Sequence, residues 1–466
     1  MNEVAASLGE VGLPARRIET EVVVIGGGIA GLTAATELAA AGSEVVVLEA
    51  RDRVGGRTWN TEIGGEANEL GGQWVAPNQS AMHELLADLE IELFDTFRTG
   101  QHVFVDRKGR SHRYEGHDAP LGEASEKAFE AAESKLDSLA KEMDPEAPWE
   151  HPDAERLDSI PFESWLRDEV SDDMARDLMR SWLAGGFLAK PAHTFSLLQA
   201  LWMIAGAGGT YELFEPEQCL AKRVVGGSQL ISLRLAERLG DRVSLSTPVH
   251  EIRWNDDSVV VEAEGLVAEG RRAIVAVPPN LTNSIRFQPA LPAWRMRMAQ
   301  SLSQGSINKV LAVYETPFWR EEGLSGQGFA PYELVRELYD NSPPSASVGV
   351  LLTFLAGENA ERAGRLGDEK RRREVLDGMA KFVGSRALEP VDYIEIDWSA
   401  QEWTRGAYGT SFGLGGLTRF GADLRRPVGP IDWACTDIAG VGHIHMEGAI
   451  RSGRRAAETC LAVVAA

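Results

Sequence analysis

The chain has 466 residues, of which 44% are hydrophobic and 25% are charged, an ordinary composition for a soluble globular protein. The formal net charge of −23 argues against nucleic acid as a partner and weakly favours cationic small molecules. The three cysteines show no C-x-x-C spacing, so the sequence predicts neither a disulfide framework nor a metal site.

Nothing in the sequence predicts a membrane protein. The first residues lack a basic stretch followed by an apolar one, so no signal peptide is expected, and there is no run of about 20 apolar residues. We therefore expect a cytoplasmic protein. A chain of this length is expected to form two domains, with residues 1–17 as a loose extension before the first strand.

The first predicted elements surround a glycine-rich turn. Val22–Ile25 is an apolar, β-branched run, which predicts a buried parallel strand. Gly26, Gly28 and Gly31 follow as G-x-G-x-x-G; they allow a tight turn, a close approach to a pyrophosphate, and packing of the next helix on the sheet. The helix predicted over 32–41 would present its positive N-terminal end to the phosphates.

The next strand and the residues after it favour one dinucleotide. Val45–Leu48 is the predicted strand, and it ends at Glu49, 18 residues after Gly31, where an acid can bind both hydroxyls of a ribose and repels a 2′-phosphate. Gly55–Arg57 then provides a second glycine pair and a cation that can reach a phosphate or the flavin edge. NAD dehydrogenases do not need this second pair, whereas proteins that enclose FAD do, so the pattern predicts FAD.

Helical and mixed segments follow one another along the rest of the chain. A helix over 80–94 and a hairpin at Val103–Val105 precede residues 120–205, whose apolar residues recur at helical spacing. Strands and helices alternate after that. The predicted helices are 228–239, 368–383 and 446–464, and the predicted strands are 243–245, 249–254, 259–263, 272–277, 309–314 and 349–355.

The predicted fold class is α/β, with a FAD-binding Rossmann-like domain that is interrupted twice. The pieces of this domain are residues 18–80, 215–285 and 395–466. Residues 81–214 and 286–394 are expected to form a substrate-binding domain of mixed sheet and helices, with a helical insert.

Motifs spread along the chain carry a family resemblance. IGGGIAGLTAA, LEARDRVGGRT, ELGGQWVAP, RVVGGSQ, TPVHEI, SINKV, WTRGAYGTSF and MEGAIRSGRRAAE occur in this order. Together they resemble the flavin-containing amine oxidases, the monoamine and polyamine oxidase family, from Glu21 to about Leu461. The resemblance implies the amine oxidase fold and FAD contacts from Gly26, Gly28, Gly31, Glu49, Arg51, Gly56, Arg57, Gly72, Gln73, Trp74, Val249, Asp437 and Met446.

Lys309 is the sharpest catalytic candidate. It lies in the predicted strand SINKVLAVY, where a buried lysine without a partner would be costly. The resemblance implies that this lysine holds a water against the flavin N5 atom, where a cation helps electrons pass to oxygen. The alternative is a surface lysine on an edge strand, which the flanking apolar residues alone do not exclude.

The resemblance also implies two aromatic rings that flank the flavin face. Tyr408 matches one ring, but His445 stands at the other position, which departs from the family pattern. A neutral imidazole can still form a flat wall, and we expect His445 to be neutral if the substrate is an amine; it could instead bond a polar substrate group. Trp403 is a further candidate, for which ordinary core packing is an equal alternative.

Two other departures concern the cofactor. Ala407 stands where some family members carry the cysteine that links FAD covalently, so noncovalent FAD is expected. The family's A-G-T-E pattern is A-C-T-D here, with Cys435 for glycine and Asp437 for glutamate. Cys435 is expected to be a small buried packing residue.

The expected reaction is oxidation of a C–N bond in an amine, by hydride transfer to flavin N5 and with hydrogen peroxide formed from oxygen. The imine product would hydrolyse to an aldehyde or ketone. Leu213, Phe214 and Leu220 are the expected pocket walls. The sequence leaves open which amine is oxidised and whether the chain forms a homodimer.

Other functions remain open at this point. The same architecture would serve an L-amino-acid oxidase, which needs a cationic clamp for the carboxylate, or another desaturating flavoenzyme. A membrane-facing desaturase is disfavoured by the acidic helical insert. A non-enzymatic FAD-binding scaffold is disfavoured by Lys309 and Tyr408.

Overall fold

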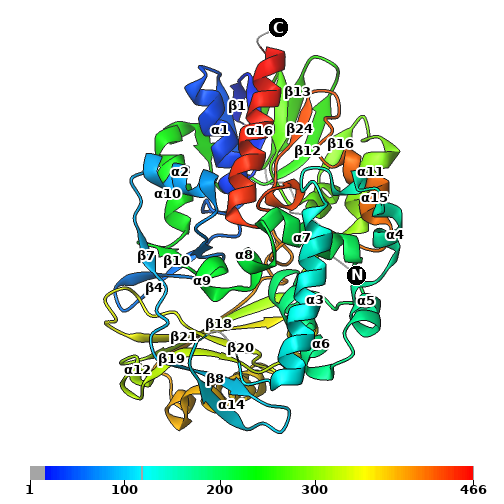
Figure 1. Cartoon of the computed structure of the whole chain (residues 1–466). Coiled ribbons are helices and arrows are strands. Elements are labelled where there is room, and N and C mark those ends of the chain that lie inside the picture. Colours follow the sequence, from blue (N-terminus) through cyan, green and yellow to red (C-terminus); the bar gives the residue numbers. More distant parts are fainter. Residues whose placement is uncertain (1–15, 117–118, 465–466) are drawn as a thin grey trace, which may run out of the picture.

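Five short parallel strands form the sheet around which the glycine-rich turn is built. The computed structural model describes residues 16–116 and 119–464 (Figure 1). The strand order is β11 (Val243–Ser244), β3 (Val45–Leu48), β2 (Val22–Ile25), β15 (Arg272–Val275) and β24 (Ile431–Trp433). Every residue of β2 and β3 is buried, as expected for a parallel sheet that is covered on both faces.

Helices cover one face of this sheet and a second sheet covers the other. Val22 and Val24 pack with α1 (Ile29–Ala40), α10 (Gln229–Leu239) and α16 (Met446–Val464). Figure 1 shows α1 and α16 side by side at the top of the molecule. The opposite face packs against the sheet β1 (Arg16–Glu19), β14 (Leu266–Gly270), β13 (Val259–Ala263), β12 (Val249–Trp254) and β16 (Arg286–Gln288).

Three predicted boundaries differ in the structure, two of them because of strand pairing. Arg16 and Arg17 are not part of a loose extension, because they pair with Leu266 and Val267 of β14; residues 1–15 of the predicted extension lie outside the described residues. Helix α1 begins three residues earlier than predicted, at Ile29. The helix predicted over 80–94 ends at Asp88, because the chain enters β7 (Leu93–Asp95), which pairs with β10 (Lys222–Val224).

A seven-stranded sheet lies at the other end of the molecule. Its order is β22 (Asp392–Asp397), β18 (Ile307–Tyr314), β21 (Gly349–Ala356), β20 (Glu337–Asp340), β19 (Leu324–Phe329), β8 (Gln101–Val105) and β9 (Ser111–Tyr114). Alternate residues of a strand face opposite sides. Val310 and Ala312 therefore pack on α14 (Asp368–Val383), while Leu311 and Val313 lie on the face that Ala407 and Tyr408 cover.

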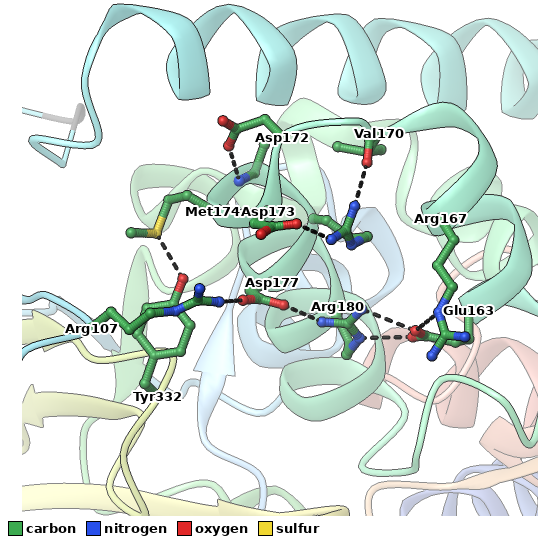
Figure 2. A network of polar contacts seen from close by, with 12 residues as sticks. Arg107, Glu163, Arg167, Val170, Asp172, Asp173, Met174, Asp177, Arg180 and Tyr332 are labelled. Atoms are coloured by element: carbon green, nitrogen blue, oxygen red, sulfur yellow. Dashed lines mark hydrogen bonds and ion pairs between the residues drawn. The ribbon is translucent and has the colours of Figure 1, made fainter.

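The helical insert lies beside both sheets (Figure 1). It comprises α3 (Glu123–Lys141), α4 (Ala154–Ser159), α5 (Phe162–Glu169), α6 (Asp173–Arg180), the π-helix η2 (Ser181–Phe187), α7 (Leu197–Ala207), α8 (Thr210–Phe214) and α9 (Pro216–Cys219). Figure 2 shows the charged contacts that fasten it to the seven-stranded sheet: Arg107, in the β8–β9 turn, bonds Asp177 at 2.9 Å, and Arg180 joins Asp177 to Glu163.

The division into two domains stays a prediction, with one helix on the other side of the predicted boundary. α2 (Ser80–Asp88) packs against α16 in the cluster of the parallel sheet. Smaller elements complete the described chain: β4 (Asn60–Ile63), β5 (Glu66–Glu69), β6 (Trp74–Val75), α11 (Ala293–Ser301), β17 (Leu302–Gln304), α12 (Phe318–Glu321), α13 (Glu358–Gly364), β23 (Thr410–Phe412) and α15 (Gly416–Phe420). Over 16–116 and 119–464, no helix has the length and apolarity needed to span a bilayer, and no metal-binding group of His, Cys, Asp or Glu occurs.

Candidate active site

A long cavity connects the parallel sheet with the seven-stranded sheet. It encloses about 1520 Å³ of empty space, part of which is open to solvent. One part of its wall comes from the ends of β2, β3 and β15, where Gly26, Glu49 and Val277 lie. The other part comes from β18 and β21, where Lys309 and Phe354 lie. The cavity is therefore shaped to hold an elongated ligand whose two ends meet different chemistry.

Glycines at the first part of the wall leave room that side chains would fill. Gly26 has φ +111°, and a Cβ there would lie 2.7 Å from the Ala276 carbonyl oxygen. A Cβ on Gly56 would lie 3.4 Å from the Cα of Gly28, so the two glycine segments meet backbone to backbone. Gly31 does not line the cavity; a Cβ there would lie 2.0 Å from the Gly26 carbonyl oxygen, so this glycine permits helix packing, the role predicted for it.

Polar groups beside these glycines fit a dinucleotide. Glu49 is buried, and its carboxylate accepts hydrogen bonds from the backbone N–H of Gly27 at 2.6 Å and of Arg51 at 2.9 Å. The Arg51 Nη2 atom is buried at the cavity and finds no hydrogen-bond partner within the described part of the chain. A buried guanidinium nitrogen without a protein partner, in a cavity that the start of α1 also lines, is suited to a pyrophosphate. The residues present therefore fit FAD.

Arg57 and Asp437 form a buried ion pair beside the cavity. Arg57 Nη2 lies 2.5 Å from Asp437 Oδ2, and Arg57 Nη1 donates to the Tyr408 carbonyl oxygen at 2.6 Å. Burial raises the pKa of Asp437, but the charge of Arg57 outweighs it and lowers this pKa to about 2. Asp437 also accepts from the Thr410 N–H at 2.6 Å and does not line the cavity, so its expected contact with the ribityl chain stays a prediction.

Lys309 lies in the middle of a sheet and not on an edge. β18 pairs with β21 on one side and with β22 on the other, and Lys309 is 2% exposed. Its Nζ atom donates to the Gly71 carbonyl oxygen at 2.9 Å and to Gln73 Oε1. Burial lowers the pKa of Lys309 to about 7. The lysine thus faces the cavity with a proton that it can lose near neutral pH.

Four of the other predicted residues line the same cavity: Trp403, Tyr408, His445 and Met446. Tyr408 packs edge-on against Phe354, with 5.9 Å between ring centroids. His445 Nδ1 lies 2.8 Å from the His443 carbonyl oxygen, so Nδ1 carries the proton, and burial lowers the pKa of His445. The imidazole is therefore uncharged at neutral pH, as expected for a wall that contacts an amine.

Some of the remaining predicted residues line the cavity and others do not. Gly28, Arg51, Gly56, Arg57, Gly72, Val249 and Ala407 line the cavity. Gln73, Trp74, Leu213, Phe214 and Leu220 do not, so a direct contact from them stays a prediction. Phe214 instead packs against Trp182 and Phe187, with centroids 5.4 and 6.3 Å apart.

Sequence reasoning missed an acidic residue behind the aromatic wall. Glu337 and Tyr339 lie on the same face of β20, and the Tyr339 hydroxyl donates to Glu337 Oε2 at 2.9 Å. Tyr339 contacts Phe354, with centroids 6.4 Å apart, and the charge of Glu337 contributes to the raised pKa of Tyr408. The signal was the E-x-Y spacing in ELYD, but no strand was predicted there to give the spacing a face.

Comparisons with known proteins agree with this geometry. A family model described as flavin containing amine oxidoreductase matches residues 29–461. Putrescine oxidase from Kocuria rosea is 45% identical over 456 residues, which cover 95% of each chain. A solved structure of wild-type putrescine oxidase bound to putrescine has a TM-score of 0.94 at 45% identity, over 97% of this chain and 100% of that one. Cyclohexylamine oxidase from Brevibacterium oxydans IH-35A has a TM-score of 0.90 at 30% identity, over 96% of this chain and 100% of that one.

The predicted family and α/β fold class are thus confirmed. The cavity holds a site that fits FAD at its glycine-rich part and presents Lys309 and Tyr408 at the other. The chain belongs to the flavin-containing amine oxidoreductase family and is an FAD-dependent amine oxidase.

Proposed function

We propose that this enzyme oxidises an aliphatic diamine of the putrescine type. The observation that carries the proposal is Glu337, a carboxylate behind the aromatic wall of Tyr408 and Phe354 whose hydrogen-bond donor, the Tyr339 phenol, is uncharged. Glu337 does not itself line the cavity, so the distal nitrogen of a substrate would have to reach it beyond these two rings. Burial raises the pKa of Glu337, and a cation placed against it would favour the ionised carboxylate and compensate its buried charge. A diamine protonated at its distal nitrogen supplies that cation while its other nitrogen lies near Tyr408.

The residues that line the cavity would each have a different role in the oxidation of such a substrate. When bound, FAD supplies the acceptor for the hydride that leaves the carbon next to nitrogen. The apolar wall excludes water and lowers the pKa of the reacting amine, so this nitrogen is neutral. Tyr408 and the uncharged His445 orient it without repelling a cation, and Lys309 provides the group that favours electron transfer to oxygen. An amino acid is disfavoured, because Glu337 would repel a carboxylate bound nearby.

A comparison of substrates tests the proposal. Putrescine and n-butylamine have the same carbon chain and differ in the distal amino group. We expect kcat/KM for putrescine to exceed that for n-butylamine by about 100-fold, because leaving a buried charge without its partner costs about 3 kcal/mol or more. Hydrogen peroxide release measures both rates and also tests oxygen as the acceptor. Equal efficiencies would remove the assigned role of Glu337.

We also propose that FAD is bound noncovalently. Ala407 is 5% exposed at the cavity wall and has no sulfur. The Cys435 thiol also lines the cavity, but burial raises its pKa, and its Sγ atom lies 2.8 Å from Asp437 Oδ2, so the nucleophilic thiolate is disfavoured.

Acid precipitation is therefore expected to release all of the flavin into the supernatant as intact FAD, as measured by absorbance and mass spectrometry. Flavin retained in the denatured pellet, or a peptide carrying the mass of FAD, would contradict this. The cytoplasmic location stays a prediction from the sequence, and whether the chain forms a homodimer stays open.

A further inference from the structure

A chain of buried amide side chains lies behind Lys309. Lys309 Nζ donates to Gln73 Oε1, Gln73 Nε2 donates to Asn341 Oδ1 at 2.6 Å, and Asn341 Nδ2 donates to Asn68 Oδ1. Asn68 Nδ2 in turn donates to the Asn341 carbonyl oxygen at 3.0 Å. These four side chains belong to residues that are at most 2% exposed. They come from β18, the β5–β6 segment and the loop after β20.

The direction of the hydrogen bonds along these amide side chains fixes the orientation of the Gln73 amide. Each amide presents its oxygen toward Lys309 and its N–H groups away from it. Turning the Gln73 amide around would place its two N–H donors against an ammonium group, which has no acceptor, and would oppose Gln73 oxygen to Asn341 oxygen. Gln73 is thus held with its oxygen toward Lys309 Nζ by its hydrogen bond to Asn341.

An ion pair borders the amide chain. Glu69 Oε2 lies 2.6 Å from Arg223 Nη2, and Arg223 Nη1 donates to the carbonyl oxygens of Asn341 and Ser342 at 3.1 Å each. Burial is the largest effect on the pKa of Lys309 and lowers it; the charge of Glu69 raises it and that of Arg223 lowers it.

On the cavity side, Lys309 meets rings and not charges. The Lys309 Nζ atom lies 5.7 Å from the centroid of the Phe354 ring. The phenols of Tyr339 and Tyr408, which pack on Phe354, stay uncharged because burial raises their pKa. The described groups that favour the protonated form of Lys309 therefore lie behind it, on the side of Gln73 and Glu69.

We propose that Gln73 is a positioning residue for Lys309. An ammonium group has three N–H donors. The Gly71 carbonyl and the Gln73 amide oxygen take two of them, which leaves one N–H for the cavity that Lys309 lines. Gln73 itself does not line the cavity, so its effect passes through Lys309. The inference rests on the catalytic role proposed for Lys309, but not on which amine the enzyme oxidises.

The test is a pH titration of the flavin absorption spectrum in the holoenzyme without substrate. The expected midpoint of the wild-type protein is the pKa of Lys309, about 7. Gln73→Glu keeps the acceptor and adds a negative charge, so the midpoint should rise by about one unit or more. Gln73→Met removes the oxygen that accepts a hydrogen bond from the Lys309 ammonium group. The charged lysine is then less stable, so the midpoint should fall.

Three further variants complete the experiment. Lys309→Met should abolish the titration. Asn341→Asp keeps the acceptor for Gln73 and places a charge one residue farther away, so it should raise the midpoint less than Gln73→Glu does. Gln327→Met is the matched control: Gln327 is 8% exposed in β19, its Nε2 atom has no partner within the described residues, and it does not line the cavity. This control should leave the midpoint unchanged.

Opposite shifts from the two Gln73 variants would support the proposal, because a purely structural role would lower the melting temperature without moving the midpoint in two directions. Shifts in the same direction, or no shift, would overturn it. A titration that survives in Lys309→Met would also overturn it, since another group would then be responsible. Because no substrate is added, failure of the diamine proposal leaves these outcomes unchanged.

Discussion

Replacing Glu337 by glutamine is expected to lower kcat/KM for putrescine by about 100-fold or more, mainly through a higher KM. The amide oxygen of the new side chain would still accept the hydrogen bond from Tyr339, so the local structure is retained. The amide would not neutralise a buried ammonium, and an uncompensated buried charge costs about 3–5 kcal/mol. The rate with n-butylamine should change little, because this substrate has no distal ammonium. Steady-state kinetics with both amines measure the difference.

A surface variant provides the control for this experiment. Glu333 lies four residues earlier in the chain; like Glu337 it does not line the cavity, but its carboxylate forms an ion pair with Lys381 at 2.6 Å. Glu333→Gln should leave the rates with both amines unchanged. If Glu337→Gln instead slows putrescine and n-butylamine by the same factor, Glu337 acts on a step that the two substrates share, and its assignment to the distal nitrogen is wrong.

Lys309→Met is expected to slow the reaction of the reduced enzyme with oxygen by about 100- to 1000-fold, the range found when one preorganised donor is removed from a buried site. Methionine fills a similar volume but supplies no positive charge where negative charge develops. Reduction by the amine should change far less, because Lys309 is proposed to act on oxygen. Stopped-flow measurement of the two half-reactions separates these effects.

Lys190 offers a matched control for Lys309. It is 7% exposed, burial also lowers its pKa to about 7, and its Nζ atom donates to the side-chain hydroxyls of Ser303 at 2.9 Å and Ser411 at 2.6 Å. Lys190 does not line the cavity. Lys190→Met should lower the melting temperature but leave the reaction with oxygen within about 3-fold of the wild-type rate. An equal loss in both variants would mean that the Lys309 effect is one of stability.

Local sequence patterns predicted the cofactor end of the molecule well. The bounds of β2, β3, β12, β13, α14 and α16 agree with those predicted. Gly26 and Glu49 could be placed at the cavity because a strand, a tight turn and a helix follow one another within a few residues. The helix predicted over 80–94 was too long, because its end is decided by a pairing with β10, which is distant in the chain.

The function of a residue was harder to predict than its position. The FAD contact expected of Gln73 stays a prediction, and the structure adds a contact that was not predicted, with Lys309, 236 residues away in the chain. The contact expected between Asp437 and the ribityl chain also stays a prediction, and its protein partners in the structure are Arg57, Thr410 and Cys435. In both cases a motif located the segment correctly, but a single polar side chain can meet either the cofactor or a neighbour that holds the cofactor site.

The sequence by itself determined the dinucleotide turn, the family and the lysine strand, because each depends on residues that are close in the chain or on motifs in a fixed order. Only the tertiary structure brought Glu337 and Tyr339 behind Tyr408 and joined Gln73 to Lys309. The physical reason is that alternation along a strand shows which residues share a face but not which other segment covers that face. The proposed choice of substrate and the proposed control of Lys309 protonation both rest on those long-range contacts.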